Sequence, residues 1–176
     1  MKHYFNYDFP VGKIWIAEEG GKITDLHFGK AKKSDMKDFE EKEAPVIKKA
    51  AKQLSEYFAG KRQEFDLPLD PKGTVFQLKV WKALQTIPYG KTKSYGAIAK
   101  KIKNDKASRA VGMANNRNPI SIIIPCHRVI GADGSLVGYG GGLKNKEYLL
   151  GLEGAKDGTK SSAKSSAKAS AKSKQA

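Results

Sequence analysis

The hydrophobic pattern changes character once along the chain, close to residue 70. Before that point, apolar residues fall in short, partly alternating runs, which are typical of β-strands. Three such runs cover Tyr4–Phe9, Val11–Ala17 and Ile23–Phe28. Gly20 and Gly21 separate the second run from the third and favour a tight hairpin. The first 28 residues therefore predict an antiparallel meander.

One helix follows the predicted strands. The charge-dense segment 30–43 predicts a solvated loop or a frayed helix. Apolar residues then recur at helical spacing over Val46–Phe58, after Pro45 and before Gly60, which are favoured start and stop residues. A short strand is expected over 64–67, and residues 68–73 are typical of a linker. This pattern predicts an α/β N-terminal domain, a small antiparallel sheet plus helix, over residues 1–70.

The second half is mainly helical. One amphipathic helix is predicted over Phe76–Ile87, before Pro88-Tyr89-Gly90. Ser94 is a plausible N-cap for a helix over 95–103, and Asn104-Asp105 for a third over 106–115. A last helix is expected over 144–152. Two short helices joined by a tight turn predict a helix-turn-helix within a C-terminal domain of residues 74–154.

The last 22 residues are low in complexity. Residues 155–176 repeat Ser, Ala and Lys, and such a composition predicts a disordered tail. The tail carries a net charge of +5, so +10 of the chain's total of +15 remains on the first 154 residues. This basicity indicates a polyanionic partner. The tail itself either attracts nucleic acid without reading its sequence or only keeps the protein in solution.

Composition excludes several classes of protein. No run of about 18 apolar residues could cross a membrane, and the N-terminus lacks the apolar stretch of a secretory signal. The chain has one cysteine and three scattered histidines, which predicts neither a disulfide nor a bound metal. We therefore expect no bound metal and an intracellular location.

The single cysteine, Cys126, is followed directly by His127 and preceded by Pro125 and apolar, β-branched residues. A thiolate is a strong nucleophile, and a nearby imidazole can accept its proton. The simpler interpretation is a buried, unreactive cysteine. Neighbouring side chains point to opposite faces in an extended strand, so the pair can cooperate only if the backbone turns or a water molecule bridges them.

The predicted third helix is rich in small residues, with Arg109 as the one long side chain in its first turns. Small side chains permit close packing against another helix. They also permit entry into the narrow minor groove of DNA, where an arginine could fill the gap left by an extruded base. The pattern alone allows both interpretations.

Together these motifs strongly resemble the O6-alkylguanine-DNA alkyltransferases, the methylated-DNA–protein-cysteine methyltransferases. The resemblance rests on one block with flanking motifs, which are Ser94-Tyr95-Gly96, Arg109-Ala110-Val111-Gly112, Asn118-Pro119, Pro125-Cys126-His127-Arg128-Val129, Gly138-Tyr139-Gly140-Gly141-Gly142-Leu143 and Lys146-Glu147. It covers roughly residues 74–153, and the first 70 residues match in layout only. It implies single-turnover, irreversible transfer of an alkyl group from O6-alkylguanine in duplex DNA, and possibly from O4-alkylthymine, to the protein.

The resemblance also implies residue roles. Cys126 is the expected alkyl acceptor, His127 its base through a water molecule, and Glu147 the group that orients His127. Tyr95 is expected to protonate the leaving guanine and to contact DNA, and Asn118 to order the turn before the cysteine. The expected minor-groove residues are Ala107, Ser108, Arg109, Ala110 and Gly112, and the expected guanine pocket consists of Pro125, Val129, Tyr139 and Gly140. The resemblance implies a monomer that binds duplex DNA and needs no cofactor. It implies a cytoplasmic location, associated with the nucleoid, or a nuclear one in a eukaryote.

Two departures from the family pattern limit the carry-over. Some members have serine where this chain has Gly140, so a hydroxyl contact to the guanine oxygen is in doubt. Some members bind zinc in the N-terminal domain through cysteine and histidine, and this chain has no cysteine there. Three other functions remain as alternatives: a non-catalytic damage-binding relative, a cysteine hydrolase, and an architectural DNA-binding protein.

Overall fold

The computed structural model describes residues 1–136, 139 and 141–155. The chain divides into two units, Met1–Lys72 with Pro119–Ile123, and Gly73–Asn118 with the described residues from Ile124 onward. None of the described helices has the length and apolarity needed to span a bilayer. The predictions for Gly140 and for the tail beyond residue 155 lie outside the described residues.

The first unit contains the predicted meander. Strands β1 (Lys2–Phe9), β2 (Gly12–Glu19) and β3 (Lys22–Phe28) pair antiparallel in sequence order. Gly20 and Gly21 have φ angles of 62° and 82°, which explains why glycines occupy the β2–β3 turn. The meander prediction is confirmed.

A fourth strand, β4 (Phe39–Glu41), pairs parallel with β1 and makes the sheet order β3-β2-β1-β4. The prediction of a loop or frayed helix is wrong here, although a 3₁₀ turn, η1, covers Lys33–Asp35. The Phe39 ring packs edge-on against Tyr4 at 6.3 Å, so one aromatic side chain anchors this short edge strand.

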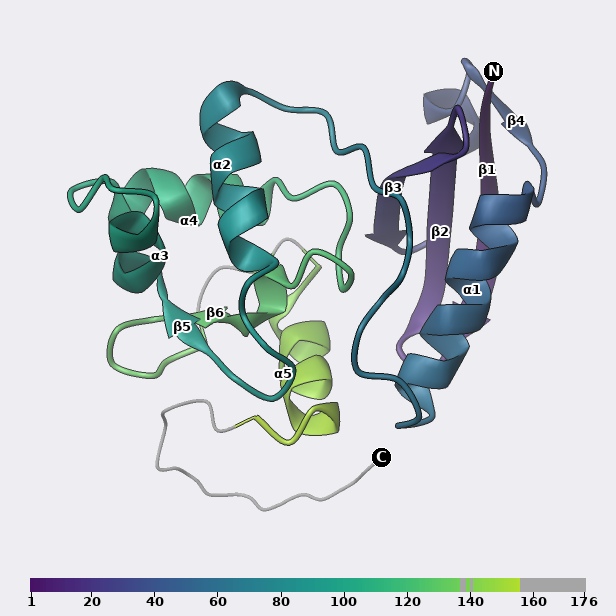
Figure 1. Ribbon diagram of the computed structural model, residues 1–176. Helices are drawn as coiled ribbons and strands as arrows, with labels where there is room; N and C mark the ends of the chain where they lie inside the picture. Colours follow the sequence, from purple (N-terminus) through teal and green to yellow (C-terminus); the bar gives the residue numbers. More distant parts are fainter. Residues whose placement is uncertain (137–138, 140, 156–176) are drawn as a thin grey trace. The chain divides into compact units, whose positions relative to one another are not determined.

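Helix α1 (Pro45–Phe58) covers a face of the sheet, as Figure 1 shows. Its buried stripe contacts β1, β2 and β3, and its Phe58 ring lies 5.4 Å from that of Phe9. Gly60 ends the helix region with a φ of 76°. The short strand expected over 64–67 is absent, and Leu69 instead forms an isolated parallel bridge with Ile23 of β3.

A distant segment also joins this sheet. The Leu26 N–H of β3 donates to the Pro119 carbonyl at 2.8 Å, and the Ser121 N–H donates to the Leu26 carbonyl at 3.0 Å. Within this segment Ile122 has a φ of 70°, a strained angle for a β-branched residue. The first unit therefore holds the stretch of chain that leads to Cys126.

The second unit is mainly helical, as predicted. Its elements are α2 (Val75–Leu84), β5 (Lys93–Ser94), α3 (Tyr95–Lys101), α4 (Ser108–Asn116), η2 (Cys126–Arg128), β6 (Val129–Ile130) and α5 (Leu143–Leu152). Thr74 and Gln77 form a reciprocal capping box at α2. The Ser94 hydroxyl accepts from the Ala97 N–H, which confirms the predicted N-cap of α3.

The turn between α3 and α4 differs from the prediction. Lys103 takes a left-handed φ of 62° there. The N-cap of α4 is Ala107, without a side-chain hydrogen bond, so the expected cap from Asn104-Asp105 is wrong. Asn104 acts one turn earlier, where its carbonyl accepts from the Ala107 N–H at 3.0 Å. The chain therefore reverses on backbone hydrogen bonds rather than on a side-chain cap.

Two contacts set the positions of α3 and α4. Strand β5 pairs parallel with β6, which joins the start of α3 to the residues directly after η2. The Trp81 indole N–H of α2 donates to the Ala114 carbonyl of α4 at 2.8 Å. Both two-residue strands were missed from the sequence, because such short elements carry no periodicity.

Candidate active site

Cys126 lies at the first position of η2, so the backbone turns at the cysteine instead of running extended. Its N–H donates to the Ile124 carbonyl at 2.7 Å, and Pro125 precedes it with φ −80° and ψ 64°. The turn removes the objection that the side chains of Cys126 and His127 must point to opposite faces. Both side chains are buried.

Three side chains surround the thiol. Burial raises the pKa of Cys126, while hydrogen bonds from Asn118 and Tyr139 and the charge of Lys146 act to lower it. Asn118 also donates from Nδ2 to the Ile124 carbonyl at 2.7 Å. The Asn118 side chain thus holds both the backbone before the cysteine and the sulfur. The thiol is protonated in its buried position, but the groups around it favour the thiolate.

His127 is completely buried and pairs with Glu153, the residue directly after α5. Its Nε2 lies 2.7 Å from Glu153 Oε2. The same carboxylate accepts two hydrogen bonds from Arg128, from Nε at 2.8 Å and from Nη2 at 3.0 Å. Glu153 therefore accepts from two neighbouring residues of the cysteine turn.

The protonation states follow from these contacts. Burial alone would raise the pKa of Glu153, but the hydrogen bonds and charges of His127 and Arg128 lower it to about 2. Burial lowers the pKa of His127, against the opposing effect of Glu153. At neutral pH an ionised Glu153 thus accepts the Nε2–H of a neutral imidazole, and Nδ1 carries a lone pair. Nδ1 is buried and has no partner among the described residues.

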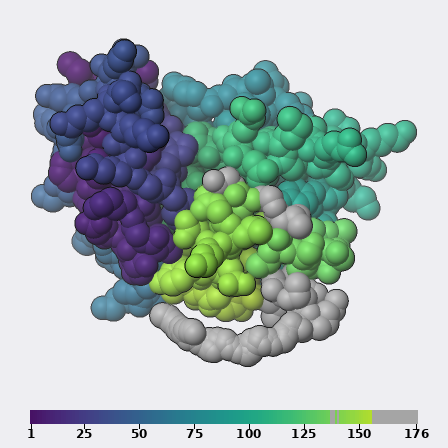
Figure 2. Space-filling view, turned by 180° about the vertical axis from the view of Figure 1, so that it is seen from behind, coloured from purple at the N-terminus to yellow at the C-terminus, as the bar shows by residue number. Residues whose placement is uncertain are grey.

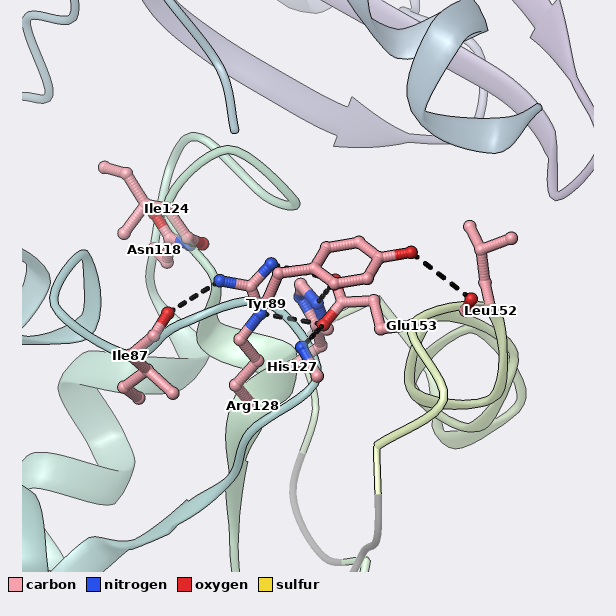
Figure 3. A network of polar contacts seen from close by, with 9 residues as sticks. Ile87, Tyr89, Asn118, Ile124, His127, Arg128, Leu152 and Glu153 are labelled. Carbon is pink, nitrogen blue, oxygen red and sulfur yellow. Dashed lines mark hydrogen bonds and ion pairs between the residues drawn. The ribbon is translucent and has the colours of Figure 1, made fainter. Parts of the chain in front are cut away.

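Arg128 is held on several sides, as Figure 3 shows. Its Nη1 donates to the Ile87 carbonyl at 2.7 Å, and its guanidinium lies 5.8 Å from the centre of the Tyr89 ring. The Tyr89 hydroxyl donates to the Leu152 carbonyl at 3.4 Å, next to Glu153. The loop after α2 and the end of α5 therefore fix the cation that pairs with Glu153.

The expectation that Glu147 orients His127 is wrong. Glu147 is exposed on α5, the helix whose atoms are yellow-green in Figure 2. The buried stripe of α5 runs through Lys146, Leu149 and Leu150, and Glu153 follows at the same helical spacing. Glu147 lies about 100° around the helix from Lys146 and faces solvent instead.

Lys146 is a site residue that the sequence did not single out. It is fully buried, and its Nζ donates to the Val129 carbonyl at 2.5 Å. The ammonium also lies 5.9 Å from the centre of the Tyr139 ring. Burial lowers the pKa of Lys146 to about 8. A buried lysine on a helix is uncommon, and its place on the apolar stripe was the available signal.

Tyr95 begins α3 and is half-buried beside the thiol. Burial raises its pKa, and a charge on Cys126 acts in the same direction, so the phenol stays protonated at neutral pH. A Cβ at Gly112 would lie 3.7 Å from the Tyr95 ring, which therefore packs on the α4 backbone. The charge of Cys126 acts on the Tyr95 phenol, and the proton-donor role that the resemblance implies for Tyr95 stays a prediction.

Helix α4 presents small side chains to solvent. Ser108, Arg109 and Ala110 are exposed, whereas Val111 and Ala114 are buried inside the second unit, to which α4 belongs. Ala107 and Gly112 are half-buried. Arg109 thus projects from a smooth exposed face. The exposure of these small residues supports the interpretation in which they lie open to a binding partner. Gly112 packs closely on the inner side of α4.

The expected pocket residues meet around the cysteine only in part. Pro125, Val129 and Tyr139 are buried, and the Val129 carbonyl accepts from Lys146. Gly140 lies outside the described residues. Among the described residues, no group of three or more His, Cys, Asp or Glu side chains could hold a metal ion.

Two family models match the chain. Residues 2–71 match the ribonuclease-like domain of 6-O-methylguanine DNA methyltransferase, and residues 75–155 match the DNA-binding domain of the same family. A methylated-DNA–protein-cysteine methyltransferase from Methanosarcina acetivorans is 53% identical over 155 residues, which are 87% of this chain and 99% of the relative. One from Bacillus subtilis, described as constitutive, is 47% identical over 158 residues, 87% of this chain and 96% of the relative.

Solved structures agree with this assignment. The crystal structure of Mycobacterium tuberculosis O6-methylguanine methyltransferase has a TM-score of 0.80 and 49% identity, covering 88% of this chain and 93% of that one. A complex of the M. tuberculosis protein with DNA has a TM-score of 0.79 and 48% identity, covering 88% of this chain and 96% of that one. The chain belongs to the 6-O-methylguanine DNA methyltransferase family.

Proposed function

We propose that this protein repairs DNA directly, by moving the alkyl group of O6-alkylguanine onto Cys126. The observation that carries the proposal is the buried Cys126 thiol, next to a neutral histidine held by Glu153 and Arg128. An ordinary structural cysteine needs no such neighbours. A nucleophilic cysteine needs a proton acceptor that is itself oriented by a third group.

The chemistry follows from the residues. The thiol proton passes to His127 Nδ1, and the thiolate attacks the alkyl carbon in line with the bond to O6. That bond breaks, its electron pair goes to the guanine, and the Tyr95 hydroxyl donates the proton that makes guanine a better leaving group. The product is a thioether, which has no carbonyl for water to attack. The protein therefore reacts once, and no cofactor is required.

We propose that α4 enters the minor groove of duplex DNA. Its exposed face of Ser108, Arg109 and Ala110 supports this placement, because small side chains allow a helix to approach a groove about 6 Å wide. Arg109 takes the place of the guanine when it leaves the stack for the site. We further propose that the protein binds DNA as a monomer, in the cytoplasm, close to the nucleoid.

The thiol separates this proposal from its rivals. A non-catalytic binder of damaged DNA needs no acceptor, and an architectural protein needs no buried relay beside its cysteine. A cysteine hydrolase needs an oxyanion hole and repeated turnover. Release of more than one equivalent of product would favour the hydrolase.

Intact-mass measurement tests the proposal. The protein is incubated with a duplex oligonucleotide that carries one O6-methylguanine, and Cys126→Ala is the control. We expect the wild-type chain to gain the mass of one methyl group and the control to gain none. Tight binding of the modified duplex without any change in mass would contradict alkyl transfer.

A further inference from the structure

Asn115 is a buried amide on the inward face of α4. It is 1% exposed, on the same stripe as Val111 and Ala114. Its Nδ2 donates to the Cys126 carbonyl at 3.3 Å. An apolar side chain would fill this position without burying polar atoms. The presence of a polar amide at this buried position therefore needs a physical reason, and its contact with Cys126 suggests where that reason lies.

The second polar atom of this amide supplies that reason. Asn115 Oδ1 is buried and has no hydrogen-bond partner among the described residues. Its orientation is fixed, because turning the amide over would place Oδ1 against the Cys126 carbonyl, acceptor to acceptor. Buried polar atoms almost always have partners, so an orphaned acceptor points to a donor that the protein chain does not provide.

His127 Nδ1 is a second orphaned acceptor beside the same cysteine. Its Nε2–H is committed to Glu153, so Nδ1 can only accept while the ring is neutral. Asn115 is hydrogen-bonded to the Cys126 carbonyl, and His127 directly follows Cys126 in the chain. One acceptor belongs to the side chain that holds the Cys126 carbonyl, and the other belongs to the next residue. One water molecule suits such a pair, because it has two hydrogens to donate and can accept a further hydrogen bond.

We propose that Asn115 is a positioning residue for proton transfer from Cys126, and that its Oδ1 holds, together with His127 Nδ1, the water that receives the thiol proton. The inference rests on the proposed function and extends it to a residue on α4. The Cys126 S–H donates to the water oxygen, and the water donates one hydrogen to each acceptor. In the step, sulfur loses its proton to the water, the water passes one of its hydrogens to Nδ1, and a thiolate and an imidazolium remain.

This arrangement gives α4 two tasks. Its first turn carries Arg109 on the exposed face, and its last turn holds the water and the Cys126 carbonyl through Asn115. The helix that faces DNA in the proposed function therefore also controls how easily the Cys126 thiol loses its proton. Asn118, two residues beyond α4, contacts the Ile124 carbonyl and the Cys126 sulfur, whereas Asn115 contacts the Cys126 carbonyl.

The test is the variant Asn115→Leu, which is similar in size and removes both polar atoms. Its matched control is Asn116→Leu, at the exposed neighbouring asparagine. The substrate is free O6-benzylguanine, so that DNA binding does not contribute. The rate of benzyl transfer to Cys126 is followed by intact mass between pH 6 and 9, and the melting temperature is recorded for each variant.

We expect Asn115→Leu to react about tenfold more slowly at pH 7, with its pH profile displaced upward by about one unit, since one pKa unit is a tenfold change in thiolate. Its melting temperature is expected to stay the same or rise, because an unsatisfied polar atom is lost. Asn116→Leu is expected to keep the wild-type profile. A purely structural role would change the melting temperature and leave the pH profile in place.

The outcomes separate this inference from the function beneath it. If the wild type takes up the benzyl group and Asn115→Leu keeps the wild-type profile, the inference is overturned and the function stands. If the wild type takes up neither the benzyl group nor the methyl group of the modified duplex, the proposed function fails as well. Asn115→Ala is measured alongside, so that an answer is obtained even if leucine prevents folding.

Discussion

Glu153 Oε2 lies 2.7 Å from His127 Nε2, although the two residues are separated by 26 positions in the sequence. Arg128 donates twice to the same carboxylate, and both side chains of this pair are almost completely buried. A buried carboxylate with a permanent cation stays ionised, and an ionised carboxylate fixes the histidine tautomer. The ability of His127 to accept the Cys126 proton therefore depends on Glu153, the residue after α5.

The variant Glu153→Gln tests this dependence. It leaves Arg128 buried without its counter-charge, so we expect a loss of about 3–5 kcal/mol in the free energy of unfolding. Alkyl transfer is expected to slow by about 10²-fold or more, since His127 loses its orienting carboxylate. Denaturant titration and single-turnover kinetics measure the two effects.

The matched control for this variant is Glu147→Gln on the exposed face of the same helix. We expect it to change stability by less than about 0.5 kcal/mol and to leave the rate unchanged. An equal loss in both variants would show that the carboxylate at 153 has no special part in the site.

The pH dependence of stability reports on the same pair. The pKa of Glu153 is about 2 in the folded state and 4.5 ordinarily, so its stabilising effect is present above pH 4.5 and is lost as the pH falls toward 2. The difference corresponds to about 3 kcal/mol. The lowered pKa of His127 adds a loss that begins below its ordinary value of 6.5, because the unfolded chain then binds the proton more readily.

Chemical denaturation at a series of pH values checks this prediction. We expect the free energy of unfolding to fall from about pH 6.5 downward and to fall further below about pH 4.5. A flat profile between pH 6 and 3 would contradict the assigned protonation states of His127 and Glu153.

Lys146 predicts an effect at alkaline pH. Its pKa is about 8 in the folded state against an ordinary 10.5, so burying its charge costs stability in full below pH 8, and that cost disappears as the pH rises to 10.5. Lys146→Met has no charge to bury. The difference in unfolding free energy between wild type and Lys146→Met is therefore expected to shift in favour of the wild type between pH 8 and 10.5. A constant difference over this range would show that the pKa of Lys146 is not lowered in the folded protein.

Arg109 predicts a difference between two substrates. Its side chain is exposed on α4 and has no part in the network around Cys126. We expect Arg109→Ala to slow repair of O6-methylguanine in duplex DNA by about tenfold or more, because nothing then fills the gap left by the flipped base, which costs a few kcal/mol to extrude. Reaction with free O6-benzylguanine is expected to stay within about twofold of the wild type, because surface substitutions usually change free energies by no more than about 0.5 kcal/mol. Equal slowing with both substrates would count against a role in extruding the base.

Sequence periodicity was sufficient for the long elements of the fold. The meander of β1, β2 and β3 and the helices α1 and α2 each show several apolar residues at one period, and these predictions are confirmed in type. Strands β4, β5 and β6 have only two or three residues each, so no period can be read from them. Their pairing depends on packing between distant segments, such as Phe39 against Tyr4.

The candidate site was predictable where one motif carries it. Cys126, His127 and Asn118 fall in one block, and the structure brings Tyr95 to the same place. Glu153 was missed because the motif that carries the resemblance ends at Glu147. Helical spacing from Lys146 through Leu150 would have identified Glu153 as the buried carboxylate.

The stoichiometry of transfer tests the central claim most directly. The protein is mixed with a tenfold excess of duplex DNA containing O6-methylguanine, and the methyl groups on each protein molecule are counted by mass after peptide mapping. We expect one methyl group per molecule, on the peptide that contains Cys126, and one equivalent of repaired guanine with no further turnover. Repair of several equivalents, or a methyl group on any other residue, would contradict the account.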